Sequence, residues 1–337
     1  MKQFLLPEQG RFYKANLHCH TTCSDGDLTP EEIRTVYKEK GYSVVAYSDH
    51  EVLFPHDDLR QEDFLPLNAV ELDAGHPDEW DASQRFHICC IALEPDNVVT
   101  PCFSPEWSKL FRIAQRDQAK APAGRPVLSR VHTAENCNAL IAEAKELGFY
   151  VTYNHPDWSL EQQEDFGCYT GMDAIEIYNY GCVVEGYQDY NPKDYDFLLR
   201  QGKRIHAIAA DDNHNRKPRN SMGWDSCGGW VMIKADALEY RTITAALQAG
   251  NFYASTGPEI QELWFEDGRV HVTCGEAERI FLTTARRSRQ MRWAPEGESL
   301  TQAEFDVVPE DGFIRITVVD HRGRTADTNA YFLDKLF

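Results

Sequence analysis

The sequence predicts an α/β protein with a small all-β unit at its C-terminal end. Apolar runs alternate with segments of helical periodicity up to about residue 256, the order expected of parallel strands joined by helices. After Thr256-Gly257-Pro258 the chain changes to short strand-like pieces separated by Asp-Gly, Gly-Glu and Arg-Gly turns. A length of 337 residues with 42% hydrophobic content suffices for one large and one small core. We therefore expect a large domain over residues 1–256 and a β-sandwich over 257–337.

The helices are predicted from the signals at their ends. Thr29 as N-cap, Pro30 at the first position and Glu32 three residues after the cap begin a helix that Gly41 ends. Two further helices are expected over 133–148 and 239–249. Strands of the large domain are expected at 42–48, 65–70, 149–153, 174–178, 205–209 and 229–233. Those of the tail are expected at 263–265, 270–272, 280–282 and 314–318.

Composition limits the classes of function. The formal net charge of -20 argues against a nucleic-acid partner, because phosphate backbones are bound mainly by clusters of Lys and Arg. No apolar run is long enough for a membrane span, and the first ten residues lack the pattern of a secretory signal. The 10 cysteines form no Cys-x-x-Cys pair, so we expect reduced thiols. These features favour a cytoplasmic protein with a small-molecule partner, and they do not indicate an oligomeric state.

A His-x-His pair near the N-terminus is the first candidate for a metal site. His18 and His20 follow a short strand-like run, and alternate residues of an extended segment point to the same side. Asp25 lies five residues beyond His20 and offers a carboxylate. Cys19 and Cys23 lie close by, but no second Cys or Cys/His pair at finger spacing completes a zinc-thiolate site. Nitrogen and oxygen ligands are therefore the stronger hypothesis.

Further ligand-type residues recur at the ends of later strands, where parallel α/β enzymes place their chemistry. They are His50 after Asp49, Glu71, His87, His155 after Asn154, and His214 after Asp211 and Asp212. Six other histidines have no such placement, and we interpret them as ordinary core or surface residues: His56, His76, His132, His206, His271 and His321. The repeated placement predicts one shared site.

These motifs resemble, in order, those of the PHP family, the polymerase and histidinol phosphatase metallohydrolases. The resemblance covers roughly residues 12 to 256. It rests on His18-x-His20 with Ser24-Asp25-Gly26, Ser48-Asp49-His50, Glu71 with His87, Asn154-His155-Pro156 and Asp212-Asn213-His214. A weaker match, Tyr253 to Ile260 followed by the β-rich tail, is similar to a branch that includes carbaryl-hydrolase-like members.

The resemblance implies a distorted barrel of seven βα units with a trinuclear metal site at its C-terminal mouth. One ion would be held by His18, His20, Glu71 and Asp212. Glu71 would bridge to a second ion held by His87 and His155, and the third would be held by Asp25, His50 and His214. Asp211 adjoins Asp212, and either acid is open as the ligand or as its supporting partner.

Ligands of this type suit Mn²⁺, Fe²⁺ or Zn²⁺. Two or three such ions would share a hydroxide held at Glu71, Asp212, His18 and His20, and they would stabilise charge on a phosphoryl group without a protein nucleophile. For substrate phosphate the candidates are Arg216, Lys217 and Arg219, with Arg130 less favoured. Other candidates for the pocket are Glu176, Asn179, Trp158, Trp224 and Trp230. Asp49 is a candidate for orienting the neighbouring His50.

The expected function is that of a metal-dependent phosphoesterase acting on a small phosphorylated metabolite such as a nucleotide or sugar phosphate. Hydrolysis of a carbamate, ester or amide on the same ions is the first alternative, because metal hydroxide also attacks carbonyl carbon. A non-catalytic, metal-stabilised module that serves a partner through the β-rich tail is the second. A polymerase-associated exonuclease is disfavoured by the acidic balance.

Overall fold

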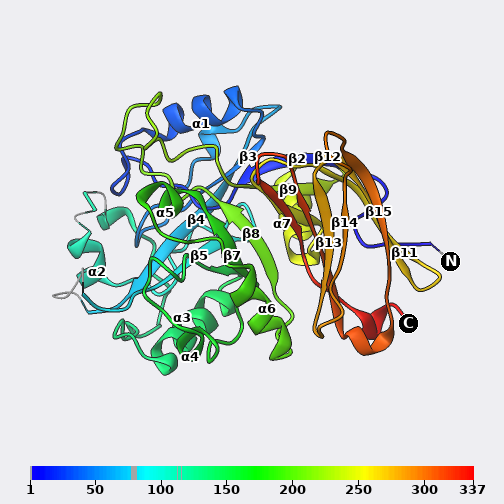
Figure 1. Cartoon of the computed structure of the whole chain (residues 1–337). Coiled ribbons are helices and arrows are strands. Elements are labelled where there is room, and N and C mark those ends of the chain that lie inside the picture. The colour runs from blue at the N-terminus through cyan, green and yellow to red at the C-terminus, as the bar shows by residue number, and fades with distance from the viewer. Residues whose placement is uncertain (1, 77–81, 112, 115) are drawn as a thin grey trace.

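The computed structural model describes residues 2–76, 82–111, 113–114 and 116–337. Within them an α/β body adjoins a β-rich C-terminal part, and both termini lie at the β-rich end (Figure 1). The α-helices are α1 (Pro30–Glu39), α2 (Pro105–Leu110), α3 (Ala134–Glu146), α4 (Gln163–Phe166), α5 (Tyr180–Glu185), α6 (Pro192–Arg200) and α7 (Tyr240–Ala249). No helix among the described residues is long and apolar enough to cross a membrane.

The strands fall into two groups. Those of the body are β2 (Arg11–Asn16), β3 (Val44–Tyr47), β4 (Leu65–Ala74), β5 (Phe86–Ala92), β6 (Phe149–Tyr153), β7 (Ala174–Asn179), β8 (His206–Ala210), β9 (Trp230–Ala235) and β10 (Phe252–Ser255). Those of the β-rich part are β1 (Gln3–Phe4), β11 (Ile260–Glu266), β12 (Arg269–Ala277), β13 (Arg279–Thr284), β14 (Gln290–Trp293), β15 (Leu300–Asp306), β16 (Phe313–Val319), β17 (Thr325–Thr328) and β18 (Tyr331–Phe332). Every strand expected from the sequence has a counterpart, and β4 and β12 continue well past their predicted ends.

Helix α1 forms where its capping signals predict it. The Thr29 hydroxyl accepts the backbone N–H of Glu32, and the Glu32 carboxylate accepts that of Thr29. Ile33, Val36 and Tyr37 lie three or four residues apart and form the buried face. The helix therefore packs one stripe against the sheet while its charged residues face solvent.

The body is built on a mixed sheet, which corrects the all-parallel order expected from the sequence. Strands β2, β3 and β4 pair in parallel, and so do β6, β7 and β8. Strand β5 runs antiparallel to both β4 and β6, and β9 runs antiparallel to β2. The connection from β4 to β5, residues 75–85, is shorter than the crossover of about a dozen or more residues that a parallel neighbour needs.

Backbone hydrogen bonds join the segment after β2 to the segment after β8. The N–H of Asp212 donates to the carbonyl of His18 at 3.0 Å, and the N–H of His20 donates to the carbonyl of Asn213 at 3.2 Å. Cys19 and Asn213 form an isolated parallel bridge between them. This pairing brings the first and the last of the predicted ligand motifs together.

The β-rich part continues the sheet of the body. Strand β17 pairs with β10, so the order β13-β16-β17-β10-β9-β2 runs across the predicted boundary at residues 256 and 257. A second, four-stranded sheet, β1-β11-β12-β15, pairs the N-terminal residues with the tail. Apolar side chains from both sheets, including Leu263, Val272 and Ile316, form a core between them. The tail thus packs against the body, and the two sheets pack on one another.

A buried arginine links the two parts. The guanidinium of Arg315 on β16 pairs with Asp196 of α6 at 2.7 Å and with Asp327 of β17 at 3.1 Å. All three side chains are at most 2% exposed. Because water does not reach these charges, each depends on its partner for compensation.

We expect Arg315→Met to lower the free energy of unfolding by about 3 to 5 kcal/mol, because buried Asp327 loses its counter-charge and buried Asp196 keeps only the more exposed Arg289 and Arg200. Urea unfolding at neutral pH, followed by circular dichroism, measures the change. The matched control is Arg269→Met, whose ion pairs with Glu304 and Asp306 are exposed and which we expect to cost less than about 1 kcal/mol. Equal effects of the two substitutions would contradict this assignment.

The start of β8 provides a pH-dependent contribution to stability. Burial lowers the pKa of His206 to about 4, and its Nδ1 lies 2.9 Å from the hydroxyl of Tyr150. The folded state thus keeps His206 neutral where the unfolded chain, with an ordinary pKa of about 6.5, binds a proton. This contribution is complete above pH 6.5 and is lost as the pH falls towards 4, by up to about 3 kcal/mol. Urea titrations across that range should show a shallower loss in His206→Asn than in the wild type.

Candidate metal centre

The nine predicted metal ligands meet at one edge of the body's sheet. They form three groups in which one ligand atom from each residue lies within 4.8 Å of those of the others. The groups are His20, Asp25, His50 and His214; His18, His20, Glu71 and Asp212; and Glu71, His87 and His155. Residues separated by up to almost two hundred positions in the sequence therefore share one site.

The direction of the strands explains this meeting. His18, His50, His155 and Asp212 follow the C-terminal ends of parallel strands, which lie at the same edge. His87 is the second residue of β5, and because β5 runs in the opposite direction, its beginning lies at that edge too. Glu71 lies inside β4 instead of at its end, which corrects the predicted strand boundary.

The carboxylate of Glu71 is the centre of the site. Its Oε1 lies 3.2 Å from His18 Nε2, 3.1 Å from His87 Nδ1 and 3.4 Å from His155 Nε2. Its Oε2 lies 3.2 Å from His20 Nε2 and 3.3 Å from His50 Nδ1. Five imidazoles thus surround one carboxylate that is fully buried.

The structure distinguishes the two neighbouring acids at 211 and 212. The Oδ1 of Asp212 lies 3.2 Å from His18 Nε2 and 3.0 Å from His20 Nε2, so this carboxylate faces the ligand cluster. The carboxylate of Asp211 instead accepts the backbone N–H groups of residues 227, 228 and 229 and the hydroxyl of Tyr37. Asp212 is thus the candidate ligand, and Asp211 fixes the loop behind it.

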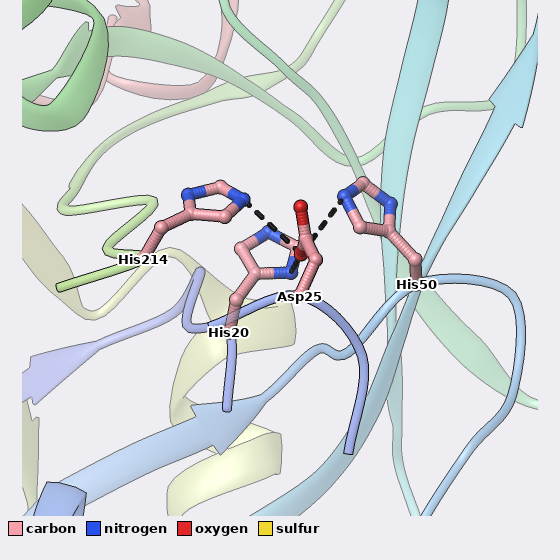
Figure 2. A group of neighbouring side chains, drawn as sticks. All are labelled: His20, Asp25, His50 and His214. Carbon is pink, nitrogen blue, oxygen red and sulfur yellow. Dashed lines mark ion pairs between the residues drawn. The ribbon is translucent and has the colours of Figure 1, made fainter. Parts of the chain in front are cut away.

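Asp25 lies among the three histidines of the first group, His20, His50 and His214 (Figure 2). Its Oδ1 lies 3.3 Å from His214 Nε2, 3.8 Å from His50 Nε2 and 3.9 Å from His20 Nδ1. The short loop that carries Asp25 turns at Gly26, where a Cβ would lie 2.9 Å from backbone atoms of His20. The glycine is therefore required for the close return of this loop to the site.

Several polar side chains hold the ligands without belonging to the central cluster. Glu176 accepts from His18 Nδ1 at 2.7 Å and from the backbone N–H of His155 at 3.0 Å. Asp73 lies 2.8 Å from Nε2 of His87, on the side of the ring that faces away from Glu71. A second partner of this kind fixes the orientation of a ligand imidazole.

Asp49 has a different role from the one the sequence suggested. It was expected to orient the neighbouring His50, but its carboxylate accepts the backbone N–H and the hydroxyl of both Thr21 and Ser24. It therefore secures the loop that leads to Asp25. Asn179 donates to Glu176 at 2.9 Å and to Asp212 at 3.2 Å, so it braces the site from behind.

The charges of the cluster determine which groups are ready to bind a cation. Burial opposes charge on Glu71, but the surrounding histidines outweigh it and hold the pKa of this carboxyl well below its usual range. Burial and the neighbouring His20 lower the pKa of His50 to about 3. Burial opposes charge on His20 as well, but contacts with Asp212 and Glu71 raise its pKa to about 10. The acids thus stay ionised and His50 keeps a free electron pair, whereas ligation by His20 would release a proton.

The donor set fits divalent cations. Among the described residues, the buried atoms without a hydrogen-bond partner of suitable geometry include His20 Nδ1, His50 Nδ1 and Glu71 Oε2. Each belongs to one of the three groups, and leaving such atoms unpaired in a protein interior is costly. Imidazole nitrogen and carboxylate oxygen are the ligands that Mn²⁺, Fe²⁺ and Zn²⁺ accept.

A cavity of about 450 Å³ opens onto the cluster. Asp25, His50, Glu71, His87, His155, Asp212 and His214 line its inner part. Phe111 stacks on the ring of His50 with centroids 4.3 Å apart, and Trp158 packs against His87 and His155 at 5.1 and 5.0 Å. The site thus has a polar floor and aromatic walls, which suits a small molecule with a flat group.

Of the predicted phosphate-binding residues, only Arg216 lines this cavity, and its Nη2 lies 2.5 Å from Asp25 Oδ2. Lys217 is exposed and outside the lining, and Arg219 pairs with Glu39 on the surface. Arg130 is buried in an ion pair with Glu51. These three predictions are corrected. For Lys217 and Arg219 the reason is that a short sequence distance from His214 does not determine on which side of the loop a side chain lies, and Arg130 instead compensates the buried charge of Glu51.

The tryptophan predictions divide in the same way. Trp158 lines the cavity, while Trp224 and Trp230 pack beside a separate hydrophobic cluster near α1. Three contributors were missed from the sequence: Asp73, Phe111 and Asp225, which accepts the backbone N–H of His214 at 2.8 Å. Only Asp73 had a usable signal, because it lies two residues after Glu71 and alternate residues of a strand share a face.

Two comparisons with known proteins find no match: none with a family model, and none among the curated proteins. Among solved structures, a two-domain protein from Bacteroides vulgatus containing a predicted PHP-like metal-dependent phosphoesterase is similar over 98% of this chain and 90% of its own, with 13% identity and a TM-score of 0.46.

A candidate metal-dependent phosphoesterase from Bifidobacterium adolescentis is similar over 66% of this chain and 94% of its own, with 18% identity and a TM-score of 0.36. An amidohydrolase from Chromobacterium violaceum with bound sulfate is similar over 59% and 87%, with 16% identity and a TM-score of 0.39. All three likenesses are distant.

The different environments of Asp211 and Asp212 lead to opposite mutational effects. We expect Asp212→Asn to lower the affinity for Mn²⁺ about tenfold or more, because a ligand carboxylate is lost while the fold keeps its hydrogen bonds. Asp211→Asn should instead lower the free energy of unfolding by about 1 to 3 kcal/mol, because several buried donors lose a charged acceptor. Equilibrium dialysis with elemental analysis and urea unfolding measure the two quantities. An exchange of the two effects would identify Asp211 as the ligand.

Proposed function

We propose that the chain is a metal-dependent hydrolase of the PHP type that cleaves small phosphorylated metabolites such as nucleotides or sugar phosphates. One observation carries the proposal: the buried carboxylate of Glu71 lies within 3.4 Å of five imidazoles. Such a concentration of ligand groups at the bottom of a cavity exceeds what a stable core needs, since buried ionisable groups are costly.

The residues suit two or three divalent cations. His18, His20, Glu71 and Asp212 would hold one, His87 and His155 with Glu71 a second, and Asp25, His50 and His214 a third. When bound, such cations lower the pKa of water towards neutrality and offset negative charge on a phosphoryl group. The proposal includes a barrel-like closure of the body, supported by the bridge between Cys19 and Asn213.

The residues around the cavity would bind and orient the substrate. Arg216 lies at the rim with its guanidinium against Asp25, where it can also contact an anionic oxygen that enters the cavity. Phe111 and Trp158 offer flat apolar surfaces to the remainder of the substrate and reduce access of bulk water to the ligands. No serine, cysteine or lysine nucleophile is required by this arrangement.

A second candidate function is hydrolysis of a carbamate, ester or amide at the same ligands. The observation in its favour is the aromatic wall formed by Phe111 and Trp158, which suits an aryl leaving group. The presence of Arg216 at the rim favours the phosphoesterase, because a neutral carbamate has no use for a guanidinium there.

A substrate panel with defined metal content tests the proposal. We expect protein loaded with Mn²⁺ to release phosphate from mononucleotides or sugar phosphates and to lose this activity after chelation, with recovery when Mn²⁺ is restored. Arg216→Ala should lower kcat/KM for the phosphate ester about tenfold, because one charge-assisted hydrogen bond is lost. Phosphate release and initial rates are the readouts.

Lys217→Ala is the matched control, because it removes an equal charge one residue away but outside the cavity. Turnover of aryl carbamates without phosphate release would favour the second candidate. Absence of turnover on every ester, together with metal-dependent melting, would leave a non-catalytic module.

A further inference from the structure

A second hollow, of about 690 Å³, lies where the body meets the β-rich part. It is bordered by the turn between β16 and β17, by residues 224–230, and by tyrosines at the end of β7. None of its lining residues belongs to the cavity above the metal ligands. It is therefore a separate feature of the surface.

The hollow is basic in a strongly acidic protein. The chain has 54 acidic and 34 basic residues, yet the lining contains no acid and five basic side chains: Lys14, Lys40, Arg219, Arg322 and Arg324. Arg219 and Arg324 are paired with Glu39 and Asp320. The side chains of Lys40 and Arg322 have no ion pair within the described residues, and both are exposed. Positive charge without an ion-pair partner among the described residues thus lines the hollow from both the body and the tail.

Aromatic rings form the rest of the surface. They are Tyr178, Tyr180, Tyr190, Trp224 and Trp230. The ammonium of Lys14 lies 3.7 Å from the centroid of the Trp230 ring. The ring of Tyr180 lies directly on Gly228, where a Cβ would approach it to 2.3 Å. The glycine is needed for this packing, which keeps an aromatic surface at the floor of the hollow.

We propose that this hollow binds a phosphorylated small molecule that carries an aromatic ring, as a nucleotide does. Its volume is of the size found for small-molecule sites, which is about 300 to 1,000 Å³. Lys40 and Arg322 attract the phosphate, since both are free to form charge-assisted hydrogen bonds. The tyrosine and tryptophan rings stack on the flat group. Because unpaired positive charge and partly exposed aromatic rings line the same hollow, we expect a ligand that carries an aromatic group as well as a phosphate.

The floor of the hollow is connected to the metal ligands. The backbone N–H groups of Cys227 and Gly228 donate to the carboxylate of Asp211, the residue before Asp212. A ligand in the hollow therefore touches the loop that Asp211 holds, and it joins that loop to the turn at Arg322. We therefore expect the ligand of this hollow to act as a regulator that binds without being hydrolysed.

Isothermal titration calorimetry of the full chain tests the proposal. The probe is the methylene phosphonate analogue of AMP, whose C–P bond is not hydrolysed. We expect Lys40→Ser/Arg322→Ser to weaken a binding event about tenfold or more. The matched control is Lys193→Ser/Arg279→Ser, which removes two exposed charges outside both sites and should change the affinity less than twofold. Adenosine and ribose 5-phosphate, each with half of the recognised chemistry, should bind more weakly than the analogue.

Three results would overturn the proposal. The analogue fails to bind at millimolar concentration, the double substitution at Lys40 and Arg322 leaves every binding event intact, or Arg216→Ala alone abolishes all binding. The last result would place the analogue only in the cavity above the metal ligands. Because the hollow shares no residue with that cavity, the outcome of this binding test does not depend on whether the protein hydrolyses a substrate.

Discussion

The organisation of the body depends on the burial of one carboxylate. Glu71 is fully buried in the middle of β4, where an ionised group without compensation costs several kcal/mol or more. Five imidazoles provide the compensation, and they come from segments that follow β2, β3 and β6 and from β5. The edge of the sheet at which these segments meet is thus also where the charge of the interior is concentrated. A divalent cation among the same groups would serve this purpose better than protons, since it satisfies several lone pairs at once.

Two of the candidate ligands, His50 and Asp212, directly follow an acid whose carboxylate binds backbone N–H groups. Asp49 precedes His50, and its carboxylate binds the loop of Thr21 and Ser24. Asp211 precedes Asp212, and its carboxylate binds the N–H groups of residues 227–229. In both cases the first residue, Asp49 or Asp211, fixes a loop that carries or supports a ligand. The negative charge of this first residue is stabilised by hydrogen-bond donors instead of by a cation. The residue that follows it, His50 or Asp212, is thus free for ligation.

The sequence predicts the helices with clear caps, most strands and the complete set of nine ligand candidates. These features are local: Thr29 and Glu32 cap α1 through their own backbone, and His18 and His20 share a side because the segment is extended. The direction of β5 and the continuation of β4 to Ala74 were missed, because strand order depends on pairing between distant segments. The positions of Lys217 and Arg219 were missed for a similar reason. A loop residue's neighbours are determined by the path of the loop, and periodicity carries no information about that path.

The β-rich part is more than an attached domain, because it shares both a sheet and a buried charge network with the body. Strand β17 pairs with β10, and Arg315 lies between an acid of α6 and an acid of β17. Such an interface fixes the turn at Arg322, which lines the same hollow as Lys40 of the body. Like charges that line one hollow repel each other, and an interface held by hydrogen bonds and a buried ion pair can sustain that repulsion. A bound anion would offset this repulsion. The rigid junction therefore makes a binding site at this position physically reasonable.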